Sequence, residues 1–287
     1  MTIKEWFRKA LEEKWAIPHF NISTLEQLIA MVNVAKRLAS PLHVGTSGGE
    51  AKHLGMRQSV YLVRAFREES GLPIFLNADH FHSTDEAKLA IDAGYDSINI
   101  DLSSQSYEEN IRGTKEIVEY AKLKDVNISV EGELGHLLGS SEIQKEIIEV
   151  KPEDMTDPDR AVHYLAETGI DRLAPAVGNL HGIAANSKNL DFERIAALRK
   201  ILPGEVDLVL HGGSGIADDQ VKKAIELGMN NVHINTEIRV AYADSLRKAL
   251  ADNPEQTTPY KIFPQVLAAM EKVIEDKIKL FGSVNRV

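Results

Sequence analysis

The sequence predicts an α/β protein with the (β/α)8, or TIM-barrel, architecture and extra C-terminal helices. Short strand-like runs alternate with amphipathic helix-like segments along the chain. Eight such strand candidates are found, and 287 residues is a suitable length for one barrel. No linker rich in proline, glycine or serine divides the chain, so we expect one domain over residues 1–287.

The predicted elements follow from apolar runs bounded by capping residues and glycines. The strand candidates are residues 16–22, 42–47, 74–80, 97–103, 127–135, 172–181, 206–212 and 231–238. The helix candidates are residues 24–39, 57–70, 84–93, 107–123, 157–168, 191–202 and 218–227. Several helices begin at Ser, Thr or Asp and end at a glycine, such as Gly94, Gly169 and Gly228.

Two regions depart from the repeating pattern. Residues 135–156 form a connection of about twenty residues, a length that usually belongs to a lid or binding loop. The alternative is a decorative or disordered insertion. Residues 241–287 predict a C-terminal extension of two or three helices, with a break near 253–259.

Composition limits the classes of function. The formal net charge of −10 disfavours nonspecific binding to nucleic acid or to an anionic membrane. There is no cysteine, which excludes disulfides, thiolate zinc sites and cysteine nucleophiles. No signal peptide is visible, and no apolar run approaches the roughly 18 residues of a membrane span. We therefore expect a cytoplasmic protein.

Three histidines, His80, His181 and His211, close apolar runs on the third, sixth and seventh predicted strands. Because the carboxyl ends of barrel strands share one rim, these side chains could meet at one ion. Three imidazoles suit Zn²⁺ or a similar divalent ion and leave a coordination position open for chemistry. A structural or surface role is the alternative, and we assign it to the following histidines: His19, His43, His53, His82, His136 and His163.

Acidic residues fall at the same predicted rim. Asp79 directly precedes His80, and Asp101 ends the fourth strand. Glu131 and Glu133 lie two residues apart on the fifth strand, so their side chains point to one face. Buried carboxylates are costly unless a cation or hydrogen bonds compensate them. An internal salt-bridge network is the alternative, but these strand ends offer few basic partners, which favours a metal site.

Glycines and small polar residues follow the last two predicted strands. The segment His-Gly-Gly-Ser-Gly occupies residues 211–215, and Asn235 and Thr236 come after the eighth apolar run. In such barrels the loops after strands seven and eight are the usual phosphate position. Glycine lets the backbone approach an oxyanion closely, and exposed N–H groups bind it. A phosphorylated ligand is therefore expected.

Together these motifs resemble those of the class II, metal-dependent ketose-bisphosphate aldolases, which include fructose-1,6-bisphosphate and tagatose-1,6-bisphosphate aldolases. The resemblance covers essentially the whole chain. Its motifs are IPHFN at 17–21, ADH at 78–80, IDLS at 100–103, GELG at 132–135, VGNLHG at 177–182, LHGGS at 210–214, NTE at 235–237 and GSVNR at 282–286. The last is similar to the tail of the tagatose-bisphosphate branch.

The resemblance implies catalytic Zn²⁺, or another divalent ion, on His80, His181 and His211. Asp79 would be the acid/base at the carbon that becomes the aldehyde. The implied reaction is aldol cleavage or condensation of a ketose phosphate, giving dihydroxyacetone phosphate and an aldehyde such as glyceraldehyde 3-phosphate, as in glycolysis. A divalent ion would stabilise the enediolate charge that develops, so a Schiff-base lysine is not required.

The resemblance also implies the surroundings of the metal. Asp101 and Glu133 would orient its ligands or provide an alternative metal position, and Glu142 would be the loop acid. A monovalent cation is a second candidate cofactor, and a homo-oligomer, dimer or tetramer, is expected. The implied substrate- and phosphate-binding residues are Asn21, Ser47, Gly182, Gly212, Gly213, Ser214, His233, Asn235 and Thr236.

Three departures from the family pattern surround the expected substrate. His233 stands where the family commonly has asparagine, and the loop has Gly-Ser-Ser-Glu at 139–142 in place of a glycine pair followed by acids. The family lysine shortly after the second histidine is missing, and Lys188 comes later. Two other hypotheses remain open: a metal-dependent sugar-phosphate isomerase or epimerase, and a catalytically silent sugar-phosphate-binding homologue.

Overall fold

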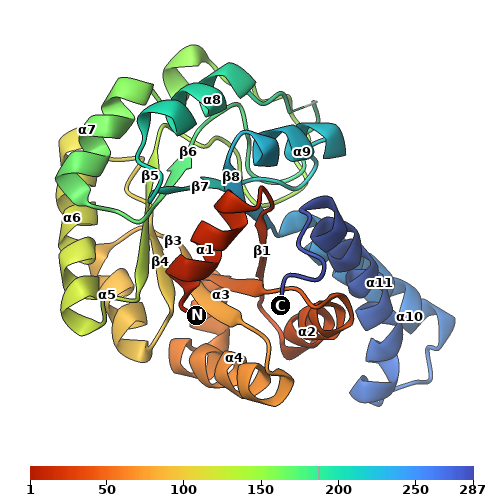
Figure 1. Ribbon diagram of the computed structural model, residues 1–287. Coiled ribbons are helices and arrows are strands. Elements are labelled where there is room, and N and C mark those ends of the chain that lie inside the picture. The colour runs from red at the N-terminus through yellow and green to blue at the C-terminus, as the bar shows by residue number, and fades with distance from the viewer. Residues whose placement is uncertain (187) are drawn as a thin grey trace.

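The computed structural model describes residues 1–186 and 188–287 and confirms the predicted barrel. The eight strands follow one another around a closed parallel sheet, with β8 paired to β1 (Figure 1). The strands are β1 (Ile17–Asn21), β2 (Leu42–Ser47), β3 (Ile74–Phe81), β4 (Ser97–Ile100), β5 (Ser129–Leu134), β6 (Arg172–Pro175), β7 (Asp207–Leu210) and β8 (Met229–Ile234).

Helices surround the barrel. Helix α1 (Ile3–Glu12) precedes the first strand. The others, in chain order, are α2 (Leu25–Leu38), α3 (Gly48–Leu54), α4 (Met56–Ser70), α5 (Thr84–Ala93), α6 (Tyr107–Lys124), α7 (Pro158–Thr168), α8 (Phe192–Ile201), α9 (Asp218–Glu226), α10 (Thr236–Asp252) and α11 (Pro259–Leu280). Thr24, Ser83 and Asp157 cap their helices by accepting a backbone N–H in the first turn. None of the helices over the described residues has the length and apolar character needed to traverse a bilayer.

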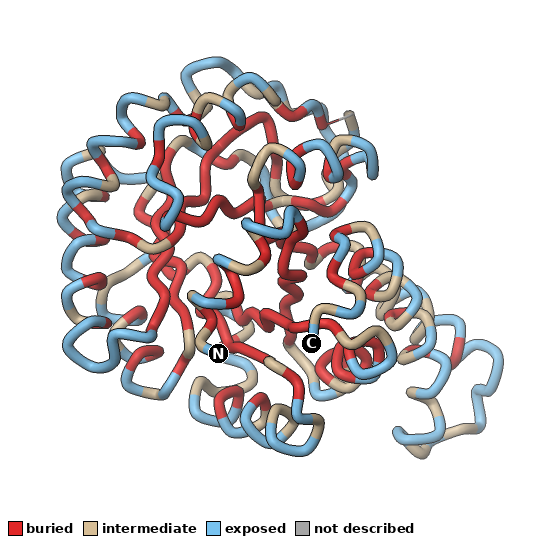
Figure 2. The backbone as a smooth tube through the Cα atoms, viewed as in Figure 1, coloured by how far each residue is buried: buried red, intermediate tan, exposed pale blue. Residues whose placement is uncertain are grey.

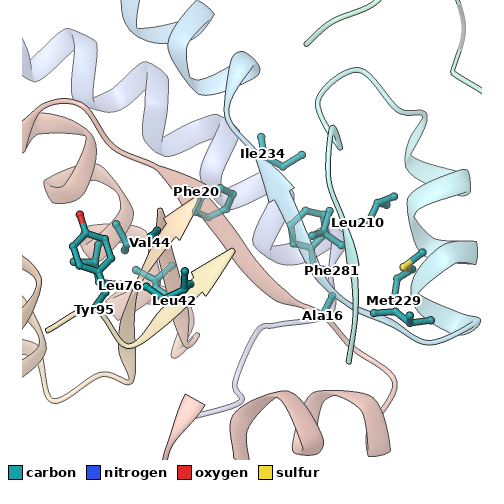
Figure 3. Close-up of a cluster of buried hydrophobic side chains, with 14 of the residues drawn as sticks. Ala16, Phe20, Leu42, Val44, Leu76, Tyr95, Leu210, Met229, Ile234 and Phe281 are labelled. Carbon is teal, nitrogen blue, oxygen red and sulfur yellow. The ribbon is translucent and has the colours of Figure 1, made fainter. Parts of the chain in front are cut away.

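The apolar core lies between the strands and the helices that cover them. Figure 2 shows the strands buried and the outer helix faces exposed. Figure 3 shows part of this core: Val44 and Leu76 lie beside Leu42 and Tyr95, and Phe281 lies beside Leu210 on the other side of the view. These side chains fix the strands against the helices and so hold the strand ends in place.

Helix α1 closes the end of the barrel at which the strands begin. The Phe7 side chain is fully buried, with the Arg172 guanidinium 5.1 Å from its ring centroid. Asn230 Nδ2 donates to the Phe7 carbonyl oxygen at 2.9 Å. This end is therefore sealed, and the carboxyl ends of the strands remain as the open rim.

The sixth strand is shorter than the predicted 172–181, because β6 ends at Pro175. Gly178 follows with φ of +94°, a conformation that L side chains rarely adopt. Asn179 stabilises the turn: its Oδ1 accepts from Val177 N at 2.8 Å, and its Nδ2 donates to His211 O at 3.0 Å. His181 therefore lies on the β6–α8 loop and not at a strand end.

The predicted start of the C-terminal extension, residue 241, is also wrong. Helix α10 begins at Thr236, two residues after β8, so it is the helix of the eighth β/α unit. The additional helix is α11, which lies beside α2 and α10 (Figure 1). Arg37 on α2 holds it through ion pairs to Glu271 at 2.7 Å and Glu275 at 3.1 Å.

The long connection at 135–156 contains the short 3-10 helix η1 (Pro152–Asp154). It is joined to the β6–α8 loop by a bridge between Ile143 and Ile183. Gln144 N donates to Ile183 O at 2.9 Å, and Ile183 N donates to Glu142 O at 3.0 Å. The two loops therefore lie together, and movement of 135–156 as a lid stays a prediction.

Candidate metal centre and active site

The rim at the carboxyl ends of the strands brings the three expected histidines together. His80 Nε2 lies 3.0 Å from His181 Nε2 and 2.7 Å from His211 Nδ1. These ligand atoms all lie within 4.8 Å of one another. Three imidazole nitrogens aimed at one point form the donor set that Zn²⁺ prefers, so the residues fit a divalent ion.

Backbone strain positions His80. Its φ of +49° is in the left-handed region, which is unusual for a residue with a Cβ, and the β3–β4 register shifts between Ala78 and Phe81. The His80 backbone N–H donates to Asn99 Oδ1 at 2.9 Å. The bulge thus turns the imidazole toward His181 and His211. Strain of this kind is frequent at functional sites.

Two carboxylates contact the other nitrogen of His80. Its Nδ1 lies 3.0 Å from Asp101 Oδ2 and 3.2 Å from Glu133 Oε2. Burial alone would lower the pKa of His80, but the facing carboxylates, Glu133 foremost, raise that pKa well above its usual value. Asp101 is itself fixed by Ser103, whose Oγ donates at 2.6 Å. Both acids therefore lie beside the histidine cluster.

Glu131 has a different partner from the one expected. His211 Nε2 lies 2.6 Å from Glu131 Oε1, and Arg172 Nη1 lies 2.7 Å from Glu131 Oε2. Arg172 and Glu131 are both fully buried. The internal salt bridge that the sequence analysis disfavoured is therefore present at this position, because Arg172 at the start of β6 points into the barrel. The pair orients His211 from within the barrel.

Asp79 lies at the same rim, and two neighbours hold its carboxylate. Asn21 Nδ2 donates to Asp79 Oδ2 at 2.8 Å, and His233 Nδ1 lies 3.2 Å from Asp79 Oδ1. Burial would raise the pKa of Asp79, but the neighbouring His80 and His233 outweigh it and hold that pKa well below its usual value. His233 is buried and stacks on His19, with ring centroids 3.5 Å apart.

The glycines adjoin the histidines and allow close backbone packing. Gly182 has φ of +76° and Gly212 has φ of +63°. A Cβ on Gly182 would collide with the Glu142 carbonyl, and one on Gly212 with the Leu180 carbonyl. Gly213 N donates to His233 O at 3.0 Å, which ties the β7–α9 loop to β8.

A cavity of about 450 Å³ opens over this rim, a volume in the usual range for small-molecule sites. Its lining includes Asp79, His80, His181, Ser47 and Asn235. A narrow extension of the cavity is lined by six more of the expected substrate residues, which are Asn21, Gly182, Gly212, Ser214, His233 and Thr236. Gly213, the last expected substrate residue, lines neither part of the cavity.

Glu142, the expected loop acid, does not line the cavity that holds the histidines. It is exposed and lines a neighbouring cavity over α10, whereas Ser141 lines the histidine cavity. Arg239 on α10 holds this part of the loop, since its Nη1 donates to Ser141 O at 2.8 Å. In this arrangement Glu142 and Asp79 are not brought together.

Several residues at this site were not predicted from the sequence, among them Glu50, Arg172, Arg239 and two histidines that line the cavity, His82 and His136. Glu50 Oε2 accepts from Asn21 Nδ2 at 3.0 Å and so joins the group around Asp79. Arg172 supports Glu131, and Arg239 lines the cavity. Arg172 is the first residue of an apolar strand, and a charged residue at such a position indicates a buried ion pair. Glu50 and Arg239 lie on helices, and their sequence neighbourhoods carry no comparable signal.

Comparisons with known proteins agree with this geometry. The model of the class II fructose-bisphosphate aldolase family matches residues 1–286. The structure of the YdjI aldolase from Escherichia coli K12 is 31% identical, with a TM-score of 0.82, covering 99% of this chain and 98% of that one. A Coccidioides immitis protein assigned as a fructose-1,6-bisphosphate aldolase is 27% identical, with a TM-score of 0.85, covering 99% and 97%. The fructose-bisphosphate aldolase of Campylobacter jejuni, 21% identical with a TM-score of 0.82, shares the fold, covering 99% and 95%.

Proposed function

This chain belongs to the class II fructose-bisphosphate aldolase family, and from that membership we propose that it cleaves a ketose bisphosphate with the help of zinc. Membership makes it an aldolase, a carbon–carbon lyase. The proposed substrates are fructose-1,6-bisphosphate and tagatose-1,6-bisphosphate, and the proposed products are dihydroxyacetone phosphate and glyceraldehyde 3-phosphate. The reverse reaction is the aldol condensation.

One observation carries the proposal of a metal enzyme. His80, His181 and His211 direct nitrogen atoms at one point, and the Asp79 carboxylate lies within 4.8 Å of ligand atoms of His211 and His233. Burial lowers the pKa of His181 to about 3, which favours its neutral imidazole, whereas a metal ion would have to displace the proton that Glu133 and Asp101 favour on His80. When bound, the ion stabilises negative charge developing on the ketose-derived half of the substrate.

Asp79 is the proposed acid/base. In cleavage its carboxylate takes the proton of the C4 hydroxyl, and in condensation it returns that proton to the new alkoxide. Asn21 and His233 fix the carboxylate in place, which keeps it at the cavity wall beside the histidines. A positioned acid/base needs this restraint because proton transfer falls off steeply with misplacement.

The phosphate at the ketose end is proposed to bind the loops after β6, β7 and β8. The narrow extension of the cavity is lined there by Gly182, Gly212, Ser214 and Thr236. Asn235 lines both parts of the cavity, which suits a role along the length of the substrate. His233 Nδ1 lies 3.2 Å from Asp79 Oδ1. We therefore expect the histidine that stands in place of the family asparagine to affect the acid/base as well as phosphate binding.

A panel of ketose phosphates tests the proposal. The purified enzyme with zinc is assayed for release of dihydroxyacetone phosphate from fructose-1,6-bisphosphate, tagatose-1,6-bisphosphate and the corresponding 1-phosphates. We expect release from at least one bisphosphate, with the preferred C4 configuration read from the relative kcat/KM values. Interconversion of ketose phosphates without triose phosphate would replace cleavage by an isomerase or epimerase activity. Tight binding of the ketose phosphates with no turnover would instead indicate a silent homologue.

A further inference from the structure

Lys188 occupies an unusual environment next to the site. Its side chain is buried, with 2% of the residue exposed. Its Nζ lies within hydrogen-bonding distance of four backbone carbonyl oxygens: Leu180 at 2.7 Å, Gly182 at 2.6 Å, Gly212 at 2.7 Å and Ser214 at 2.5 Å. Over the described parts of the chain, no carboxylate oxygen lies within 4.0 Å of this ammonium to pair with it.

The four carbonyls form a cage for a cation. An ammonium has three N–H donors, so four short contacts exceed what hydrogen bonding to lysine requires. Rings of carbonyl oxygens that replace a hydration shell are the usual environment of a monovalent cation. Without a positive charge at the centre, the four carbonyl dipoles would face one another in a buried space, which is costly.

The cage joins the two loops that carry two of the proposed metal ligands. Leu180 and Gly182 flank His181 on the β6–α8 loop. Gly212 directly follows His211, and Ser214 belongs to the same β7–α9 loop. A cation shared by these carbonyls therefore fixes the separation of His181 and His211. It also fixes the backbone at which the substrate phosphate is proposed to bind.

We infer that the Lys188 ammonium is a built-in replacement for a monovalent cation and a positioning residue for the proposed metal centre. The monovalent cation that the family resemblance offers as a candidate cofactor does not fit this cage, because the lysine already fills it. The enzyme therefore works without added Na⁺ or K⁺. The effect on catalysis rests on the proposed function, whereas occupancy of the cage by a cation is independent of it.

Emptying the cage tests this inference. Lys188→Ala is compared with the wild-type enzyme in buffers of equal ionic strength that contain tetramethylammonium, potassium, rubidium or ammonium chloride. We expect the variant to bind one Rb⁺ per chain in equilibrium dialysis and to gain thermal stability in K⁺ and NH₄⁺. Its kcat/KM should fall by about 10–100-fold in tetramethylammonium, the usual effect of losing a residue that orients metal ligands, and recover in NH₄⁺. The wild type should show none of these responses.

Two further variants separate loss of the positive charge from a general effect of replacing a lysine. Lys188→Met keeps the side-chain stem but lacks the charge, so it should lose activity without rescue by any cation. Lys200→Ala, at an exposed lysine on α8, should match the wild type. If Lys188→Ala can be purified folded only in K⁺ or NH₄⁺, that dependence supports the cage.

Three outcomes would overturn the inference. The first is a Lys188→Ala variant that binds no Rb⁺ and whose thermal stability is the same in every chloride. The second is a wild-type enzyme with the same Rb⁺ stoichiometry as the variant. The third is a Lys188→Ala variant that fails to fold in all of the chlorides. Because dialysis and melting need no substrate, these outcomes are separate from failure to find an aldolase substrate.

Discussion

Replacing Asp79 by asparagine should lower turnover of the preferred ketose bisphosphate by about 10²–10⁴-fold, the usual contribution of a positioned acid/base. The amide has nearly the shape of the carboxylate, so the fold and the histidine cluster should persist. Steady-state cleavage assays with zinc present, together with the zinc content of the variant, measure the effect. The expected result is near-stoichiometric zinc with kcat lost and KM changed little, because the proton transfer belongs to the transition state.

An exposed aspartate provides the control for that variant. Asp92→Asn removes a surface carboxylate that Tyr120 and Lys124 contact on the outside of the barrel. It should leave turnover unchanged. Wild-type turnover in Asp79→Asn would assign the acid/base role to another residue, with His233 the first to examine because it lies 3.2 Å from Asp79.

The second large effect is expected at His211. His211→Ala removes one of the three converging nitrogens and the partner of Glu131, which lies 2.6 Å away. Even loss of a group that only orients a ligand weakens metal affinity by about 10–100-fold, so loss of the ligand itself should exceed this range. Zinc per chain after dialysis, measured by elemental analysis, should fall well below one.

The matched control is a histidine outside the cluster. His163 is exposed on α7 and contacts Tyr107, so His163→Ala should keep full zinc content. Full zinc content in a folded His211→Ala variant would show that His211 is not a ligand. Attention would then turn to the alternative group of His80, Asp101 and Glu133, whose ligand atoms also lie within 4.8 Å of one another.

Much of the barrel could be predicted because its signals are local. Apolar runs, N-caps such as Ser83 and Asp157, and glycine ends such as Gly94 act within a few residues. The end of β6 at Pro175 was missed because Pro175 to Leu180 remains mostly apolar and buried after the strand ends. There the Gly178 conformation and the Asn179 side chain decide the backbone path. Asn179 bonds to His211 O after β7, and Gly178 packs against the Asn189 backbone.

The candidate site likewise combines features that could be predicted from the sequence with features that could not. The shared rim of a parallel barrel brings His80 and His211 together, whereas His181 reaches them from the β6–α8 loop, beyond the end of β6 at Pro175. The partner of Glu131 did not follow, because Arg172 reaches it from the next strand inside the barrel. The position of Lys188 also could not be predicted from the sequence, because it depends on how two loops fold around one ammonium. A charged residue in an apolar strand, such as Arg172, indicates a buried ion pair, but the local sequence does not identify its partner.

One zinc ion on the three histidines is proposed to make this chain a working aldolase. Titration of the metal-stripped enzyme with Zn²⁺, followed by release of dihydroxyacetone phosphate, tests it most directly. We expect no release without metal and a linear rise that reaches its plateau at one zinc per chain. Full release from the metal-stripped enzyme, in chelator and with the same ketose bisphosphate, would contradict it.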